Sequence, residues 1–239
     1  MTPYWKFADH QWDYFGTTTG QNSSDVNVDR DLFGWGTSGW DCGNTYYQPW
    51  DTDNSNASLY GPPEPNYNPP YYGYSYSLTD NYANSDWGVY NPISNGGDQP
   101  NQWRTLTRDE WYYVFNTRNT SSGIRYAKAQ VNNVYGLILL PDGWSTSYYA
   151  LNNTNDENAD FNTNIITATQ WITLEQHGAI LLPAAGSRTG ISISNEGSGV
   201  GGYWSAISSI IAFFSSNGVS CAHVSRSIGL SVRLVSDAE

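Results

Sequence analysis

The second half of the chain contains a segment whose apolar residues recur at helical spacing. Trp111, Val114 and Phe115 follow one another at intervals of three and one positions, on one side of a helix, which predicts a short helix over about 108–117. The preceding run Thr107-Arg-Asp-Glu110 has the sequence of a capping box, in which each outer side chain binds the free backbone N–H of the other. The pattern therefore predicts a helix with a defined first turn.

A second helix is predicted over about 168–177. Trp171 and Leu174 lie three positions apart in its middle, and Gly178 provides a stop signal directly after it. His177 would then stand at the helix C-terminus, where the helix dipole favours a cation.

Short runs with strand character follow and flank these helices. Tyr126–Val131 and Val134–Leu140 enclose Asn132-Asn133, a pair that tolerates positive φ and predicts a tight hairpin. Further strands are predicted at Ala179–Pro183, Gly202–Ala206, Ile210–Phe214 and Leu230–Val235. Two short helices and several short strands without βαβ alternation favour an α+β fold with small antiparallel sheets.

The first hundred residues show almost no periodicity and predict long irregular loops. Their Pro and Gly clusters, such as Pro62-Pro63 and Asn95-Gly96-Gly97, mark turns. A long irregular segment needs aromatic anchors to hold it in a compact domain. The candidates for such packing residues are Trp35, Trp40, Tyr46, Tyr47, Trp50 and Trp87.

Composition and charge narrow the function. Aromatic residues make up 15% of the 239 residues, far more than in disordered chains. Ten basic residues stand against 22 acidic ones, which gives a net charge of −12 and no basic stripe. Binding to nucleic acid or to anionic lipid headgroups is therefore not expected, and no apolar stretch is long enough to insert into a membrane.

The sequence shows no convincing catalytic constellation. His10, His177 and His223 are scattered, and no strand–Ser–helix pattern with a partner histidine is present. We therefore expect a protein that is not an enzyme and has no catalytic residues.

Two loops rich in oxygen-bearing side chains are candidate calcium sites, although we expect no cofactor. Asp156, Glu157 and Asp160 lie in an Asn-rich loop, and Asp51, Asp53 and Asn54 form a weaker candidate. Neither group has the ligand spacing of an EF-hand. Cys42 and Cys221 form no metal-ligand spacing, and one disulfide and two free thiols are both compatible with their positions.

Residues 206–228 have an unusual composition. This segment contains no Trp, Tyr, Lys, Glu, Gln, Asp or Met, although the residues before it are rich in Trp and Tyr. Nearly all of its residues can be encoded by codons that end in a pyrimidine. Such a composition results when the adenines of asparagine codons are randomised. The alternative is a Ser-rich pair of edge strands with ordinary inward-facing hydrophobic residues.

Several collinear motifs resemble one bacterial family. They are Asp31-Leu-Phe-Gly-Trp-Gly36, Trp103-Arg-Thr-Leu-Thr-Arg-Asp-Glu-Trp111, Gly136-Leu-Ile-Leu-Leu-Pro-Asp142, His177-Gly-Ala-Ile-Leu-Leu-Pro183, Gly202-Tyr-Trp-Ser-Ala206 and Gly229-Leu-Ser-Val-Arg-Leu-Val235. In these motifs the chain resembles the Fibrobacter succinogenes major paralogous domain family. The resemblance implies a C-type lectin-like fold, related to the formylglycine-generating enzyme, over residues 1–239 as one domain. The enzyme's paired reactive cysteines have no counterpart here, so its activity is not implied.

The resemblance extends to variable proteins of diversity-generating retroelements. In those proteins the segment between a Tyr-Trp-Ser motif and a terminal Ser-Val-Arg-Leu-Val strand is diversified and binds the ligand. Carried over, this implies a display protein, secreted, on a cell surface or on a phage particle, that recognises a protein or glycan on another cell or virus. The implied ligand-binding residues are Ile207, Ser209, Ile210, Ile211, Phe213, Ser220, Ala222, His223, Val224, Ser225, Ser227 and Ile228.

Two structural expectations follow from this hypothesis. The diversified side chains should lie exposed on one face, because random side chains do not satisfy a close-packed core. Trp204, Leu230, Val232 and Leu234 should alternate into the core, with Arg226 and Arg233 holding the loop bases. The alternative function is a cell-surface adhesion or carbohydrate-binding domain of fixed specificity, in which exposed Trp and Tyr stack on sugars.

Overall fold

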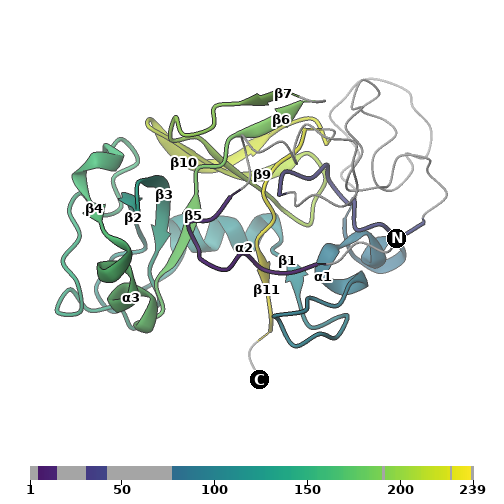
Figure 1. Cartoon of the computed structure of the whole chain (residues 1–239), viewed down its shortest axis with the longest axis horizontal. Helices are drawn as coiled ribbons and strands as arrows, with labels where there is room; N and C mark the ends of the chain where they lie inside the picture. The colour runs from purple at the N-terminus through teal and green to yellow at the C-terminus, as the bar shows by residue number, and fades with distance from the viewer. Residues whose placement is uncertain (1–4, 15–30, 42–76, 190–191, 227, 238–239) are drawn as a thin grey trace.

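The computed structural model describes residues 5–14, 31–41, 77–189, 192–226 and 228–237 (Figure 1). It confirms the α+β class: short helices accompany small, mainly antiparallel sheets. In Figure 1 a four-stranded sheet and helix α3 (Ala168–Gln176) form one end of the molecule, while helix α1 (Trp87–Tyr90) and strand β1 (Arg104–Thr105) lie towards the other. Between the two ends lie a three-stranded sheet and helix α2 (Arg108–Tyr112).

The predicted helix over 108–117 is confirmed, with a change of helix type inside it. The capping box forms, because the Glu110 N–H donates to Thr107 Oγ1 over 3.2 Å and the Thr107 N–H donates to Glu110 Oε2 over 2.7 Å. After α2 the chain continues as one π-helical segment, η3 (Tyr113–Thr117). The packing residues Trp111 and Phe115 are both buried.

The second predicted helix is confirmed as α3. It ends at the C-cap His177, and Gly178 follows with a φ of 84°, as a stop residue requires. A second capping box, between Thr167 and Gln170, begins this helix and was not foreseen from the sequence.

The four-stranded sheet contains the predicted hairpin. Strands β2 (Tyr126–Val131) and β3 (Val134–Leu139) pair antiparallel, and Asn132 and Asn133 in the turn have positive φ. Strand β5 (Ile180–Pro183) lies antiparallel to β3. The short strand β4 (Ile165–Ile166) pairs parallel to β2, so the sheet is not purely antiparallel as expected.

The three-stranded sheet is formed by the C-terminal part of the chain in the order β10-β9-β8. Its strands are β8 (Gly201–Trp204), β9 (Ile210–Ser215) and β10 (Gly218–His223), all antiparallel to their neighbours. Two small pairs complete the described strands: β6 (Ser187–Thr189) with β7 (Ser192–Ser194), and β1 with β11 (Leu234–Val235). The strand predicted over Leu230–Val235 is therefore shorter than expected.

The described residues among the first hundred are mostly irregular, as predicted, and part of them is anchored by tryptophan. Trp35 and Trp87 are buried, and Trp40 is half-buried. The short 3₁₀ helix η2 (Asp80–Ser85) and α1 were not predicted. The other proposed anchors, Tyr46, Tyr47 and Trp50, lie outside the described residues.

Buried apolar residues form three clusters. The first joins Trp111 of α2 and Phe115 of η3 to the three-stranded sheet, the second lies beneath α3, and the third surrounds Trp35, Trp87 and Trp204. None of the helices in the described part of the chain is long and apolar enough to cross a membrane.

Candidate ligand-binding face

The three-stranded sheet has two faces with different surroundings. Alternate residues of its strands, among them Tyr203, Ala212, Phe214 and Val219, pack with Trp111 in the first cluster, and we call this side the helix face. The opposite side carries Trp204 and Ile211, and we call it the tryptophan face. It rests on the third cluster, which includes Trp35, Leu78, Trp87, Ala206 and Leu230.

The β8–β9 connection is held by one buried serine. Ser205 Oγ accepts from the Ile207 N–H over 3.2 Å and is 2.8 Å from the Ile210 carbonyl oxygen, to which it can donate. The turn includes Ser209, whose φ of 62° is in the left-handed region. A residue other than glycine with this conformation indicates a turn fixed by its surroundings.

Three tryptophan indoles fix the base of the tryptophan face. Trp35 Nε1 donates to the Ser205 carbonyl over 3.0 Å, and Trp204 Nε1 donates to the Phe33 carbonyl over 2.7 Å. Trp111 Nε1 reaches the Trp204 carbonyl over 3.3 Å from the other side of the sheet. Because these donors come from three separate segments, the end of β8 is held from several directions.

The chain after β10 is anchored through its backbone. The Trp35 N–H donates to the Arg226 carbonyl over 2.8 Å, and Phe33 and Leu230 exchange two backbone hydrogen bonds of 2.9 Å each. Arg226 is buried, which agrees with a role at the loop base. Arg233 is half-buried, and burial lowers the pKa of its guanidinium.

Most of the described residues of the predicted binding segment are accessible to some degree. Four apolar side chains are half-buried and pack on the outside of the third cluster: Phe213, Ala222, Val224 and Ile228. We call these four the apolar rim. Ser220 lies opposite Phe213 in the β9–β10 register and is exposed, as is Ser225. The rim and these serines thus offer both apolar and hydrogen-bonding groups.

The structure corrects part of the predicted set. Ile210 and Ile211 are only 7% and 2% exposed, so they belong to the core, and the expectation that they lie exposed is wrong. Ile211 is buried because it lies between Trp204 and Ala222 on the tryptophan face, which the third cluster covers at this point. His223 is exposed but, by strand alternation, lies on the helix face, so the predicted residues do not all share one face.

The remaining predictions for this region have mixed outcomes. Ile207 and Ser209 lie in the β8–β9 connection and are half-buried, and Ser227 lies outside the described residues. The expected core positions Trp204, Leu230 and Leu234 are buried. Val232 is half-buried at the edge of the third cluster.

A buried lysine that the sequence analysis missed holds the tip of the β9–β10 hairpin. Lys128 on β2 is fully buried, and its Nζ donates to the carbonyls of Ser216, over 2.9 Å, and Glu157. The ammonium also lies 5.5 Å from the centre of the Phe161 ring. Burial lowers the pKa of Lys128, while the nearby acidic loop opposes this shift. The only sequence signal for it is its position in a strand that carries no other charged residue.

The candidate calcium ligands do not converge. Asp156 and Asp160 each accept a backbone N–H two residues further on, from Asn158 and Asn162. Within the described ranges, no three or more acidic, histidine or cysteine side chains are grouped to hold a metal ion. The candidate at Asp51, Asp53 and Asn54 lies outside those ranges.

The three histidines lie in separate environments. His10 bonds Asp13 and stacks on Trp12, His177 stacks on Tyr148 with ring centres 3.8 Å apart, and His223 is on β10. Cys221 on β10 carries a free thiol, whose pKa is raised by burial, while Cys42 lies outside the described residues.

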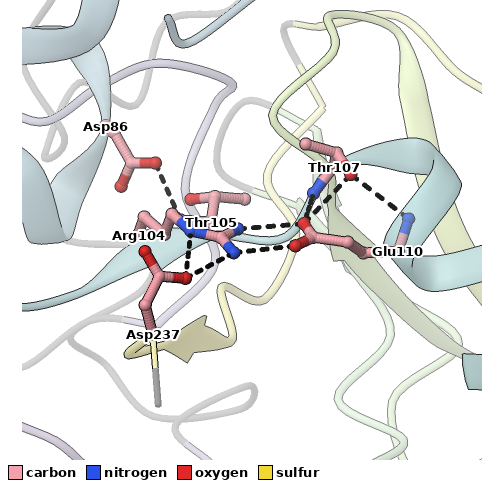
Figure 2. A network of polar contacts seen from close by, with 6 residues as sticks. All are labelled: Asp86, Arg104, Thr105, Thr107, Glu110 and Asp237. Carbon is pink, nitrogen blue, oxygen red and sulfur yellow. Dashed lines mark hydrogen bonds and ion pairs between the residues drawn. The ribbon is translucent and has the colours of Figure 1, made fainter. Parts of the chain in front are cut away.

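The charged network around Arg104 is a second candidate site (Figure 2). Arg104 binds Glu110 through two hydrogen bonds of 2.9 and 2.7 Å and also bonds Asp237. This pairing lowers the pKa of Glu110 to about 2. Its groups are satisfied by one another, so the network closes the β1–β11 pair and caps α2.

Asp86 adjoins this network and is buried. Its two carboxylate oxygens accept the N–H groups of Gly88 and Thr105, over 3.1 and 2.7 Å. Burial raises the pKa of Asp86 to about 6 in spite of these bonds. The carboxylate joins α1 to β1.

Comparisons with protein-family models, with curated proteins and with solved structures give no match for this chain.

Proposed function

We propose that this is a non-enzymatic ligand-binding protein and that its ligand contacts the apolar rim. The central contacts are Phe213, Ala222, Val224 and Ile228, with Ser220 and Ser225 as hydrogen-bonding groups beside them. In this proposal the remaining accessible residues of the segment, Ile207 and Ser209, lie at the margin.

The observation that carries this proposal is a partly exposed apolar rim on a rigid base. All four rim side chains pack on the same buried cluster, in which the indoles of Trp35 and Trp204 are fixed by hydrogen bonds. Covering such apolar surface stabilises a complex by about 25 cal/mol per Å². Because the base is fixed, the rim can bind with little loss of conformational entropy.

The finer parts of the proposal follow from the sequence resemblance. They are a C-type lectin-like fold, diversification of residues 206–228 by a retroelement, and display on a cell surface, a phage particle or in secreted form. The partner would be a protein or glycan on another cell or virus. The burial of Ile210 and Ile211 restricts such diversification to the rim and its neighbours, because core positions tolerate few side chains.

The same burial supports a second candidate, a cell-surface adhesion domain of fixed specificity. If two adjacent residues of the segment are ordinary core, the segment need not be variable. Exposed aromatic residues elsewhere, Tyr112 and Tyr113 at the α2–η3 junction, would then be the surfaces that stack on sugars.

A binding screen with matched variants separates the two candidates. The probes are a glycan array and a panel of intact bacterial cells, read by fluorescence of the labelled protein. Ser220→Arg places a bulky charge beside Phe213 at an exposed position and should reduce binding at least ~10-fold, without a change in thermal stability. Thr173→Arg, an equal charge change at an exposed position of α3, should leave binding unchanged.

The alternative has its own variant. If replacing Tyr112 and Tyr113 with serine abolishes binding while Ser220→Arg does not, the ligand contacts α2 and the rim proposal is wrong. The gene neighbourhood tests diversification separately: a template repeat that differs from the coding segment only at adenines, beside a reverse transcriptase gene, is the expected finding.

A further inference from the structure

Strand β10 forms one edge of the three-stranded sheet, and its outward backbone groups have no partner among the residues that the structure describes. The two-residue turn Ser216-Asn217 makes Ser215 and Gly218 a hydrogen-bonded pair, so that alternate residues of β10 bond β9. The hydrogen bond from the Val224 N–H to the Ser209 carbonyl, over 3.0 Å, continues this alternation.

The intervening residues point their N–H and C=O groups away from β9. They are Val219, Cys221 and His223, and no hydrogen bond joins these groups to any part of the chain that the structure describes. An edge of this kind is a template for a further strand.

Other strand edges in the described part of the chain are protected. Backbone bonds between β8 and Ser231 cover the far side of the same sheet, at Trp204 and Gly202. On β5, the Gln11 side chain accepts the Leu181 N–H over 2.8 Å, and Pro183 has no N–H. The remaining edge strands are only two or three residues long.

Strand β10 has none of these protections. It is six residues long, Gly-Val-Ser-Cys-Ala-His, without proline, lysine or an acidic residue. Natural edge strands normally use such residues to prevent pairing with another chain. The contrast with the other edges of the same molecule indicates that this edge is kept open.

We propose that β10 pairs antiparallel with β10 of a second copy of this chain, which forms a continuous six-stranded sheet across a two-fold axis. The inference is independent of the proposed ligand. The register that uses all three outward residues places the axis at Cys221. Val219 then lies opposite His223 of the second copy, and Ser220 lies opposite Ala222.

Charge supports a second copy as the occupant. The strand itself is uncharged when His223 is neutral, so self-pairing brings no like charges opposite each other. The charged groups that act on the Cys221 thiol are Arg108 and Asp109, which have opposite signs. Both side chains are well exposed, so the surroundings of the proposed axis carry charges of both signs.

The arrangement has a consequence for binding. In an antiparallel pair the two-fold axis is perpendicular to the sheet, so the tryptophan faces of both copies lie on the same side. Two rims on one side of a rigid sheet would engage a multivalent surface together, which raises avidity without new contacts.

The test compares two substitutions at one position. His223→Pro removes an outward N–H and leaves the bonds to β9 intact, whereas His223→Ala removes only the imidazole. Light scattering after size-exclusion chromatography, over about 10–300 μM, should show a dimer for the wild type and for His223→Ala. For His223→Pro the dissociation constant should rise at least ~10-fold.

Amide hydrogen exchange by NMR tests the same surface without a substitution. In the wild type the amides of Val219, Cys221 and His223 should exchange at least ~10-fold more slowly at high concentration than at low concentration. The amides of Ser220 and Ala222, which bond β9, should be protected at both. A monomer at every concentration, or a dimer without protection of the three outward amides, would overturn the proposal. If His223→Pro fails to fold, the exchange result decides alone.

Discussion

Replacing Ile211 with alanine should destabilise the protein strongly, although the residue belongs to the segment with the candidate ligand contacts. Ile211 is 2% exposed and packs in the third cluster with Trp204 and Leu230. Its truncation removes three buried carbon atoms and leaves a cavity between tightly held neighbours, which costs about 3–4 kcal/mol. For a chain of this length, that lowers the melting temperature by roughly 6–16 °C.

Ile228→Ala is the matched control for this prediction. The same side chain is truncated in the same cluster, but Ile228 is half-buried on the rim, where solvent fills the space it leaves. The cost should be about 1 kcal/mol, or roughly 2–4 °C. Urea denaturation followed by circular dichroism measures both variants, provided that the slope of the transition stays constant.

The comparison between the two isoleucines decides the outcome. Equal losses for Ile211→Ala and Ile228→Ala would show that both side chains have the same environment. The division between core residues and rim residues, and with it the choice of ligand contacts, would then be wrong.

Three other perturbations have defined outcomes. Lys128→Met should cost about 2–4 kcal/mol in urea denaturation, because two backbone carbonyls lose charge-assisted hydrogen bonds from a buried ammonium group. The pKa of Asp86 is about 6, above its value in the unfolded chain, so the contribution of this carboxyl group to stability should rise as pH falls from 7 to 5. Asp86→Asn should remove this rise, as measured by urea denaturation at both pH values. Gly201→Ala should destabilise by about 1–3 kcal/mol by calorimetry, because the new methyl group would overlap the ring of Phe214.

Each of these predictions has its own control. Lys6→Met changes the same residue type at an exposed site and should have no measurable effect on stability. Glu110, whose pKa is about 2, loses its stabilising contribution only as pH falls below about 4.5, so it leaves the pH 5–7 window to Asp86. Gly218→Ala should be tolerated, because no atom lies near its added methyl group. Each argument would be contradicted by one result: no loss of stability in Lys128→Met, an unchanged pH response in Asp86→Asn, or equal losses of stability at the two glycines.

The elements that could be predicted from the sequence are those with local signals. The α2 capping box and the Asn132-Asn133 turn are short motifs with a known backbone geometry, and both form as predicted. The helix α1 and the strand β4 were missed because they are two to four residues long. Their formation depends on tertiary contacts, such as the Asp86 bond to Thr105, that no local pattern contains.

The candidate site was predictable in location but not in detail. Composition indicated the segment at 206–228, and part of that segment forms a partly exposed rim. Which of its isoleucines are buried depends on what covers each face of the sheet. Both faces are in contact with apolar clusters here, so the simple alternation of one buried and one exposed side does not apply to β9.

The distribution of the buried tryptophans also makes the protein its own optical probe. Each cluster contains at least one fully buried indole: Trp111 in the first, Trp144 and Trp171 in the second, and Trp35, Trp87 and Trp204 in the third. Their emission should therefore be at short wavelength and shielded from soluble quenchers in the folded state. Phenylalanine replacements that leave the indoles of one cluster in place would let fluorescence follow when that cluster opens, and so show whether the binding rim loosens before the rest of the fold.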